Sequence, residues 1–557
     1  MHLRLSLICL IMGSLLAIPS PNSTGLADEG QASTATEKSA ATDATQPPVN
    51  KEKSLLARFN DKMFGLLFFD VAFGAIQVDE IDRAGKPVLQ PNGKQKQKTV
   101  SIPFLVTILI LGAIFFTFWY RFINIRGFKH ALDVVLGRYD NPNDEGEISH
   151  FRALTSALSA TVGLGNIAGV AVAIVLGGPG AVLWMMIAAV FGMAAKFSSC
   201  TLAQMYRQVN ADGSISGGPM YYLDIGLRKK GGPWGSIGKV LAIMYAILVM
   251  GGALGGGNMF QANQTVEALT STFDLPDLAP WGIGLVMAGL VAAVILGGIQ
   301  RIGAATSKIV PGMCGLYVLA ALFVIISNIS RLPEALVLMV NMAFTTNAFY
   351  GGAAGVLIWG VQRAAFSNEA GLGSAAIAHA AAKTDEPVRE GLVAMMGPFI
   401  DTIIVCLMTG LVVVITGTWN SPEVVNADNL QGVAVTAQAF GSVVSWFPLL
   451  LTLCVTLFAY STMISWCYYG ERGWIYLMDH FGGAGLRTVV VFRIIFVVFV
   501  VIGAVNNLEN VLDFSDIMIL SMAFPNIVGS VVLAPLVLEK LQDYWGRYTS
   551  GEMKSYK

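Results

Sequence analysis

Two stretches of this chain place glycines and hydrogen-bonding side chains inside otherwise apolar runs. The first carries Ser159, Thr161, Gly163, Gly165 and Asn166 in the middle of a segment as long as a membrane-spanning helix. Glycine weakens a helix, and Ser, Thr and Asn side chains compete for its backbone hydrogen bonds. A loosened turn would leave carbonyls for a cation and N–H groups for a carboxylate. Because such groups are tolerated at membrane depth only inside protein or beside a cavity, the stretch indicates a binding site.

The second stretch has the same design later in the chain. Gly371 and Gly373 follow the polar residues Ser367, Asn368 and Glu369. Each stretch opens a set of five expected spans, and an odd number per set turns the second copy upside down. This pattern is typical of inverted-repeat transporters with a site near the midplane. Close helix packing explains one such helix equally well, but two at matching positions favour a site.

Composition places the chain in the membrane. Of its 557 residues, 54% are hydrophobic and 13% charged, against about 25% charged in soluble domains. Repeated apolar runs of about 20 residues predict an all-α polytopic membrane protein. A net charge of −1 gives no basic surface for nucleic acid. Cysteines in or beside apolar helices argue against disulfides and metal clusters. The sequence has no phosphate loop, no HExxH motif and no GxSxG elbow, so no motif of these kinds indicates an enzyme.

The expected domain order begins outside the membrane. Residues 1–27 predict a signal peptide, with an uncleaved anchor as the alternative, and residues 28–100 predict an extracytoplasmic linker with an interfacial helix. An extra N-terminal span at 101–122 precedes five-helix repeats at 151–328 and 346–538 and a cytoplasmic tail at 539–557. The spans are expected near 101–122, 151–177, 180–206, 237–266, 281–299, 306–328, 346–380, 391–417, 436–468, 488–506 and 510–538.

Loop charges predict the orientation. The loop after the first span carries Arg121, Arg126 and Lys129, whereas an opposite loop carries Glu267 and Asp274. The positive-inside rule therefore predicts an extracytoplasmic N-terminus and a cytoplasmic C-terminus.

Four segments resemble one known family. They are SALSATVGLGNIAGVAVAIVLGGPGAVLWM from Ser156, GGPMYYL from Gly217, GNMFQANQ from Gly257 and FSNEAGLGSAAIAHAAAKTDEPVREGLVAMMGPFIDT from Phe366. The chain resembles the alanine or glycine:cation symporters, also called sodium:alanine symporters. The resemblance implies cation-driven uptake of small neutral amino acids, alanine or glycine, at the inner membrane. It also implies a ten-helix inverted-repeat core with one helix ahead, although the long N-terminal extension departs from the family.

An amino-acid zwitterion needs donors for its carboxylate, acceptors for its ammonium group and a pocket for its side chain. The first break offers donors, and Asn258 and Gln261 share a helical face, where an interhelical hydrogen bond is the alternative role. Phe366 is expected to close the pocket over the substrate, with ordinary packing against neighbouring helices as the alternative role. The predicted substrate-binding residues are Thr161, Gly163, Gly165, Asn166, Asn258, Gln261, Phe366, Thr462 and Trp466.

A sodium ion, the only metal expected, prefers oxygen ligands. By fold-level analogy with ten-helix inverted-repeat transporters, hydroxyls of the ninth span and carbonyls of the first break would hold it. Asp401 lies near mid-depth of its span and is a functional candidate for that reason; it carries a cation or a proton, or tethers helices. The predicted cation-binding residues are Ala160, Val162, Ser461, Ser465 and Asp401.

The second break is expected to gate. Glu369 beside Gly371 and Gly373 would control release, or cap the helix that follows, whereas Lys196 and His379 are expected to snorkel toward the cytoplasmic interface. The expected partners are a small neutral amino acid, sodium ions and membrane lipid, with proton coupling left open. The alternatives are another small solute on the same scaffold, or a channel or membrane sensor.

Overall fold

The computed structural model describes residues 55–75, 77–79, 89–90, 94–210, 213–276, 278–296, 298–344, 352–425, 432–483 and 485–556. The expected signal peptide lies outside these residues, as does most of the expected linker. The chain divides into two units, Met1–Met63 and Phe64–Lys557. The helix bundle belongs to the second unit.

The first part of the chain forms the following elements: α2 Leu55–Leu67, β1 Gln77–Asp79, β2 Gln97–Thr99, α3 Phe104–Trp119, α4 Ile123–Arg126, α5 Phe128–Val135, α6 His150–Thr161, η1 Gly165–Gly169, α7 Val170–Gly177, α8 Gly180–Met205, β3 Gln208–Val209, β4 Ile215–Ser216, α9 Pro219–Tyr221, η2 Tyr222–Gly226, α10 Leu227–Lys230, α11 Trp234–Leu254, η3 Gly255–Met259, α12 Phe260–Phe273, α13 Ala279–Ile295, α14 Gly298–Ser327, η4 Ile329–Arg331 and α15 Leu332–Ala343. The strands form two small antiparallel pairs, β1 with β2 and β3 with β4.

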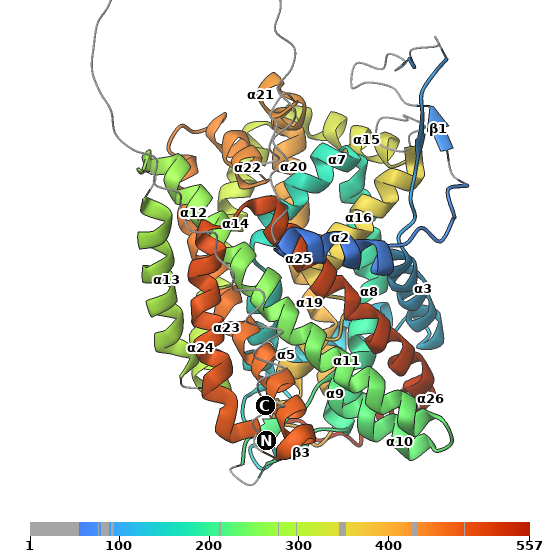
Figure 1. Cartoon of the computed structure of the whole chain (residues 1–557). Coiled ribbons are helices and arrows are strands. Elements are labelled where there is room, and N and C mark those ends of the chain that lie inside the picture. The colour runs from blue at the N-terminus through green and yellow to red at the C-terminus, as the bar shows by residue number, and fades with distance from the viewer. Residues whose placement is uncertain are drawn as a thin grey trace, which may run out of the picture. The chain divides into compact units, whose positions relative to one another are not determined.

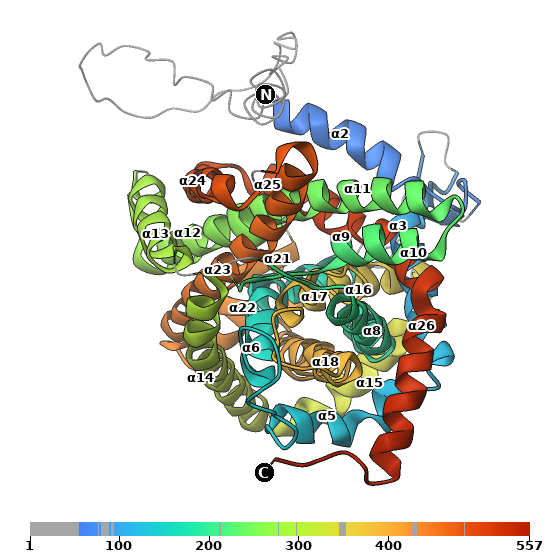
Figure 2. The same cartoon turned by 90° about the horizontal axis from the view of Figure 1, so that it is seen from below.

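The second part forms α16 Gly352–Asn368, α17 Ala375–His379, α18 Pro387–Ala394, α19 Met396–Pro398, η6 Phe399–Cys406, α20 Leu407–Thr416, η7 Thr418–Asn420, α21 Pro422–Val425, α22 Gly432–Gly441, α23 Phe447–Gly482, α24 Gly485–Val505, α25 Leu508–Ser521 and α26 Ala523–Thr549. Figure 1 shows these helices from the side, and Figure 2 shows them from below, with α6, α8, α17 and α18 near one another.

Seven helices among the described residues are long and apolar enough to cross a membrane, and a bent pair brings the number to eight. Two shorter apolar helices, α3 and α13, coincide with expected spans. The chain is therefore an all-α, multi-pass membrane protein, as the sequence predicts. The number of eleven spans stays a prediction.

The first expected break is present. Helix α6 ends at Thr161, and Val162 is extended, with a ψ of 93°. The chain resumes as η1 and α7, and the two parts form an angle of 54°. Gly163 lies at the bend. A Cβ atom at this position would be 2.6 Å from Thr462 Oγ1, so only a residue without a side chain fits there. The glycine thus allows α6 and α23 to approach closely.

The second expected break separates α16 from α17. Glu369, Gly371 and Gly373 all have positive φ angles, of 57°, 85° and 83°. Glycine adopts this region freely, but a residue with a side chain rarely does. The strained backbone at buried Glu369 marks this turn as a functional candidate.

The expected span at 436–468 differs most from the structure. Helix α22 ends at Gly441 and α23 begins at Phe447, with Pro448 in its first turn. Proline favours the first turn because it has no N–H to leave unpaired there. The expected span, drawn from hydropathy alone, joined α22 and α23 into one helix and ended at residue 468, whereas α23 continues to Gly482.

Candidate functional site

A small cavity lies between the two breaks, and it brings together residues from α6, η1, η3, α12, α16, α23 and α25. Its volume, as the space open to the centre of a water molecule, is ≈ 10 Å³, about what one water molecule needs. Its walls are Ala160, Thr161, Gly163, Gly165, Gly256, Gln261, Phe366, Glu369, Trp466 and Ile519. The structure is therefore closed around this point.

Glycines let large side chains reach the cavity. A Cβ atom at Gly257 would lie 2.3 Å from Trp466 Cγ, and one at Gly256 would lie 2.3 Å from Ile519 Cδ1. Both glycines belong to η3, a π-helical turn inside the α11–α12 span. The wide turn and the missing side chains together bring Trp466 and Ile519 against the first break.

Gln261 supplies an unused acceptor to this cavity. Its Nε2 donates to Gly256 O at 2.9 Å, whereas its buried Oε1 has no hydrogen-bond partner among the described residues. A buried polar atom without a partner costs free energy unless a ligand or water satisfies it. Gln261 Oε1 is thus positioned to receive a donor from a ligand.

Asn166 is not part of the cavity wall, and its side chain organises the break. Its Oδ1 accepts a hydrogen bond from the Gly163 N–H at 2.8 Å, and its Nδ2 donates to Asp401 Oδ1 at 2.7 Å. The N–H of Gly163 is therefore already paired. The ligand role expected for Asn166 stays a prediction, and in this structure its side chain satisfies the Gly163 N–H at the break.

Asp401 joins the two breaks. Besides Asn166 of η1, its carboxylate accepts hydrogen bonds from Ser367 Oγ in α16 at 2.9 Å and from Thr402 Oγ1 at 2.7 Å. Asn368 Nδ2 donates to Thr402 Oγ1 at 2.9 Å. The contacts match the helix-tethering alternative, since three side-chain donors occupy the carboxylate.

Helices α6 and α23 meet in a layer of oxygen atoms. Ser159 Oγ donates to Ser461 O at 2.6 Å, and Thr462 Oγ1 donates to Ser159 O at 3.0 Å. Trp466 Nε1 donates to Ala160 O at 3.2 Å. The buried hydroxyl of Ser465 has no partner among the described residues. The expected meeting of these two helices is thus present.

Several predicted residues lie outside the cavity wall. Asn258 is buried, and its Nδ2 donates to Phe496 O at 2.6 Å, which is the interhelical alternative. Val162 lies in the first break, and Ser461, Thr462 and Ser465 lie on α23; none of the four is in the cavity wall. Neither Gly371 nor Gly373 lines it; Gly371 O accepts from Asn526 Nδ2 at 2.7 Å.

Two expectations were wrong. Lys196 and His379 do not snorkel, because both are buried. Lys196 Nζ donates to Asn368 O at 2.9 Å, so it pairs a carbonyl at the end of α16. His379 Nδ1 lies 2.5 Å from Glu390 Oε1. Tertiary partners hold these polar groups inside the bundle, which sequence position alone did not reveal.

Sequence reasoning also missed several residues. Gly256 and Ile519 line the cavity, but nothing in their residue types marks them. Arg363 and Asp516 form a buried ion pair between α16 and α25. One positive and one negative residue within two apolar spans could have predicted this ion pair, since ionised groups inside a membrane span need partners.

Comparison with known proteins agrees with this architecture. Residues 87–557 match the model of the Sodium:alanine symporter family. The sodium/alanine symporter AgcS of Methanococcus maripaludis is 42% identical over 79% of this chain and 94% of its own. The probable sodium/glutamine symporter GlnT of Bacillus subtilis is 34% identical over 80% and 89%.

A solved structure of MhsT in complex with L-phenylalanine is 16% identical to the chain. It covers 69% of this chain and 89% of its own, with a TM-score of 0.47. The family match spans most of the sequence, and the relatives are transporters. The chain therefore belongs to the sodium:alanine symporter family of membrane transporters and is not an enzyme.

Proposed function

We propose that this chain couples an inward flow of sodium ions to the uptake of a small neutral amino acid, alanine or glycine. The observation that carries the proposal is the closed cavity between the two breaks, with the unpaired Gln261 Oε1 in its wall. The name of the Methanococcus relative, a sodium/alanine symporter, supports the same substrate. The Bacillus relative named for glutamine makes a larger neutral amino acid the second candidate.

The ammonium group of the substrate would donate to Gln261 Oε1. Its carboxylate would face Gly165, where η1 begins and the positive end of a helix favours an anion. Thr161 lies beside both in the wall. Because the Gly163 N–H donates to Asn166, Gly163 would contribute space rather than a hydrogen bond.

The walls support a small substrate. Phe366 and Trp466 reach the cavity from α16 and α23, and Ile519 reaches it from α25. With room for about one water molecule in the closed state, even alanine requires these side chains to move outward. Glutamine would require a larger displacement.

The layer between α6 and α23 would hold the sodium ion. Carbonyls of Ala160 and Val162 with the hydroxyls of Ser461 and Ser465 provide oxygen ligands, the type that hard cations prefer. The unpaired Ser465 Oγ supports this placement. Thr462 would join the cation layer rather than the substrate pocket.

Asp401 would position the two breaks rather than bind the cation. Its carboxylate already accepts three side-chain hydrogen bonds, so we assign it the role of holding the first break against the second. Glu369, Gly371 and Gly373 would form the hinge that opens during transport. Their positive φ angles support this role, since strained turns are common in moving segments.

The proposed membrane is the inner membrane, with the C-terminus in the cytoplasm. Loop charges support this orientation. A green fluorescent protein fused after Lys557 would fluoresce on the cytoplasmic side, whereas a periplasmic C-terminus would leave the fusion dark.

Uptake into proteoliposomes tests the transport proposal. Labelled alanine or glycine should accumulate with an inward sodium gradient, and proton and lithium gradients identify the coupling ion. Gln261→Leu should abolish accumulation because it removes the unpaired acceptor. Gln264→Leu is the matched control, since Gln264 lies one turn away in α12 and outside the cavity wall. Equal activity of the two variants would refute the site, and no accumulation under any gradient would refute the transport proposal.

A further inference from the structure

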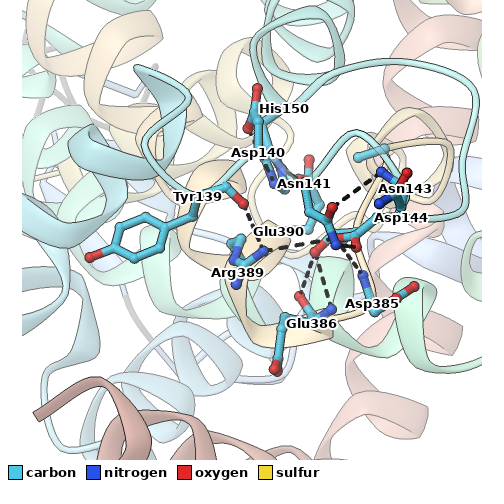
Figure 3. Close-up of polar contacts among 12 residues, drawn as sticks. Tyr139, Asp140, Asn141, Asn143, Asp144, His150, Asp385, Glu386, Arg389 and Glu390 are labelled. Carbon is cyan, nitrogen blue, oxygen red and sulfur yellow. Dashed lines mark hydrogen bonds and ion pairs between the residues drawn. The ribbon is translucent and has the colours of Figure 1, made fainter. Parts of the chain in front are cut away.

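A buried cluster of two histidines and a glutamate lies apart from the cavity. Glu390 of α18 contacts His150 Nδ1 through Oε2 and His379 Nδ1 through Oε1. All three side chains are at most 1% exposed. His150 begins α6 and His379 ends α17, so the Glu390 carboxylate connects one half of each broken helix. Figure 3 labels His150 and Glu390 together with Asp140.

Backbone contacts strengthen the same junction. The Glu147 N–H donates to Ala381 O at 2.9 Å, and the Lys383 N–H donates to Ile148 O at 2.8 Å. Arg207, which follows the end of α8, donates to Ala382 O at 2.6 Å. The segment before α6 and the segment after α17 are thus bound to each other, and α6 and α17 must separate from neighbouring helices together if this side opens.

Two atoms at the edge of the cluster face each other without a partner. His150 Nε2 and Asp140 Oδ1 are 3.9 Å apart, and neither has a hydrogen bond within the described part of the chain. With both Nδ1 atoms directed at Glu390, a proton added to His150 must go to Nε2. An imidazolium there would lie between two carboxylates, those of Glu390 and Asp140.

His379 differs from His150 in the surroundings of its Nε2 atom. Its Nε2 is also buried without a hydrogen bond among the described residues, but no ion pair joins that atom to a second carboxylate. A proton on His379 Nε2 would therefore be a buried donor that faces no acceptor, although Nδ1 of the same ring faces Glu390. The geometry selects His150 as the group that takes up a proton.

The surrounding charges are mixed. The Glu390 carboxylate acts electrostatically on Cys200 of α8 and on Arg207, which follows α8. Arg389 of α18 donates to Tyr139 O at 3.0 Å and lies 3.9 Å from Asp144. The adjoining segments also carry Arg138, Glu145, Glu147, Arg152, Lys383, Asp385 and Glu386. Of these, Arg138 pairs with Asp133 and Glu386 pairs with Arg547 of α26.

We propose that His150 Nε2 and Asp140 Oδ1 form a proton-binding site, and that the bound proton holds α6, α17 and α18 together. The proton comes from water, which reaches the site through Asp140, whose side chain is 41% exposed. Binding converts neutral His150 into a cation between two anions and strengthens both contacts. Acid therefore keeps this side of the transporter closed, and base releases it.

Cysteine labelling measures this opening directly. Thr384 is buried in the joined segment, and Ser550 is exposed at the end of α26. Thr384→Cys and Ser550→Cys are introduced together in the full chain, and mass spectrometry of peptides reads the labelling rate at each. The ratio of the two rates removes the effect of pH on thiol reactivity itself. As the pH is lowered the ratio should fall, by at most about tenfold per pH unit for one proton.

Variants identify the proton acceptor. His150→Asn keeps a donor for Glu390 but has no group at Nε2 that takes a proton, so the ratio should become independent of pH. His379→Asn makes the same change at the partner histidine; it should raise labelling at every pH and keep the slope. A slope that persists in His150→Asn, or is absent in the unmodified cluster, would overturn the proposal.

If His150→Asn does not fold, a milder variant tests the same proposal. Asp140→Asn should shift the fall in labelling to lower pH, whereas Asp385→Asn, which changes an exposed carboxylate on the adjoining segment, should not. Equal shifts in both, or none in either, would refute the role of Asp140. Labelling requires no transport, so a chain that failed to accumulate alanine would still show the slope if the proton site is correct.

Discussion

Replacing Gly163 with alanine should obstruct the closed state from within. The added methyl carbon would lie 2.6 Å from Thr462 Oγ1 and 3.5 Å from Gln261 Oε1. Overpacking of this kind costs about 1–3 kcal/mol. Moving Thr462 would also break its 3.0 Å hydrogen bond to Ser159 O, which contributes about 1 kcal/mol.

The total, about 2–4 kcal/mol, predicts a loss of about 30- to 700-fold in transport efficiency, since 1.4 kcal/mol is tenfold. The assay is initial uptake of labelled alanine into proteoliposomes at several alanine concentrations. Gly169→Ala is the matched control, because a Cβ atom there has no neighbour within 4 Å. Equal uptake by Gly163→Ala and Gly169→Ala would refute the reasoning.

Three further predictions concern buried polar groups. Asp401→Ala removes the carboxylate that accepts from Asn166, Ser367 and Thr402. Asn166 Nδ2 keeps the backbone oxygen of residue 401 and Ser367 Oγ keeps Cys406 Sγ, but Thr402 Oγ1 loses its acceptor, and a group left unpaired costs about 1–3 kcal/mol. The midpoint of thermal unfolding of the purified transporter should therefore fall, and an unchanged midpoint would contradict the tether. Asp516→Ala leaves Arg363 as an unpaired buried charge and should destabilise by about 3–5 kcal/mol, whereas Arg363→Met with Asp516→Leu should recover most of the loss in a denaturation experiment. Burial lowers the pKa of His130 to about 4, so between about pH 6.5 and pH 4 the unfolded chain binds a proton that the folded chain does not. Stability should fall across this interval, and His130→Phe should flatten the fall when unfolding is followed against pH.

The two broken helices were predictable because their cause is local. Gly163 and Gly165 weaken a helix wherever they stand, and Gly371 and Gly373 occupy backbone angles that favour glycine. The expected positions of both breaks matched the structure for that reason. Most of the apolar runs that hydropathy identified coincide with helices of the structure, since each helix must satisfy its own backbone in lipid.

The role of individual polar side chains was less predictable because it depends on partners from distant segments. Asn166 meets Asp401, which is far away in the sequence, and is not part of the cavity wall. Lys196 reaches a carbonyl freed by the second break. His150, His379 and Glu390 come together only when α6, α17 and α18 are packed, so residue type and spacing gave no sign of their cluster.

Equilibrium binding of labelled alanine to the purified transporter tests the central claim most directly. The affinity is measured in sodium chloride and in choline chloride at equal ionic strength. The account predicts that sodium tightens alanine binding and that alanine tightens sodium binding by the same factor, because the coupling between two sites is reciprocal. An affinity for alanine that is the same with and without sodium would contradict it.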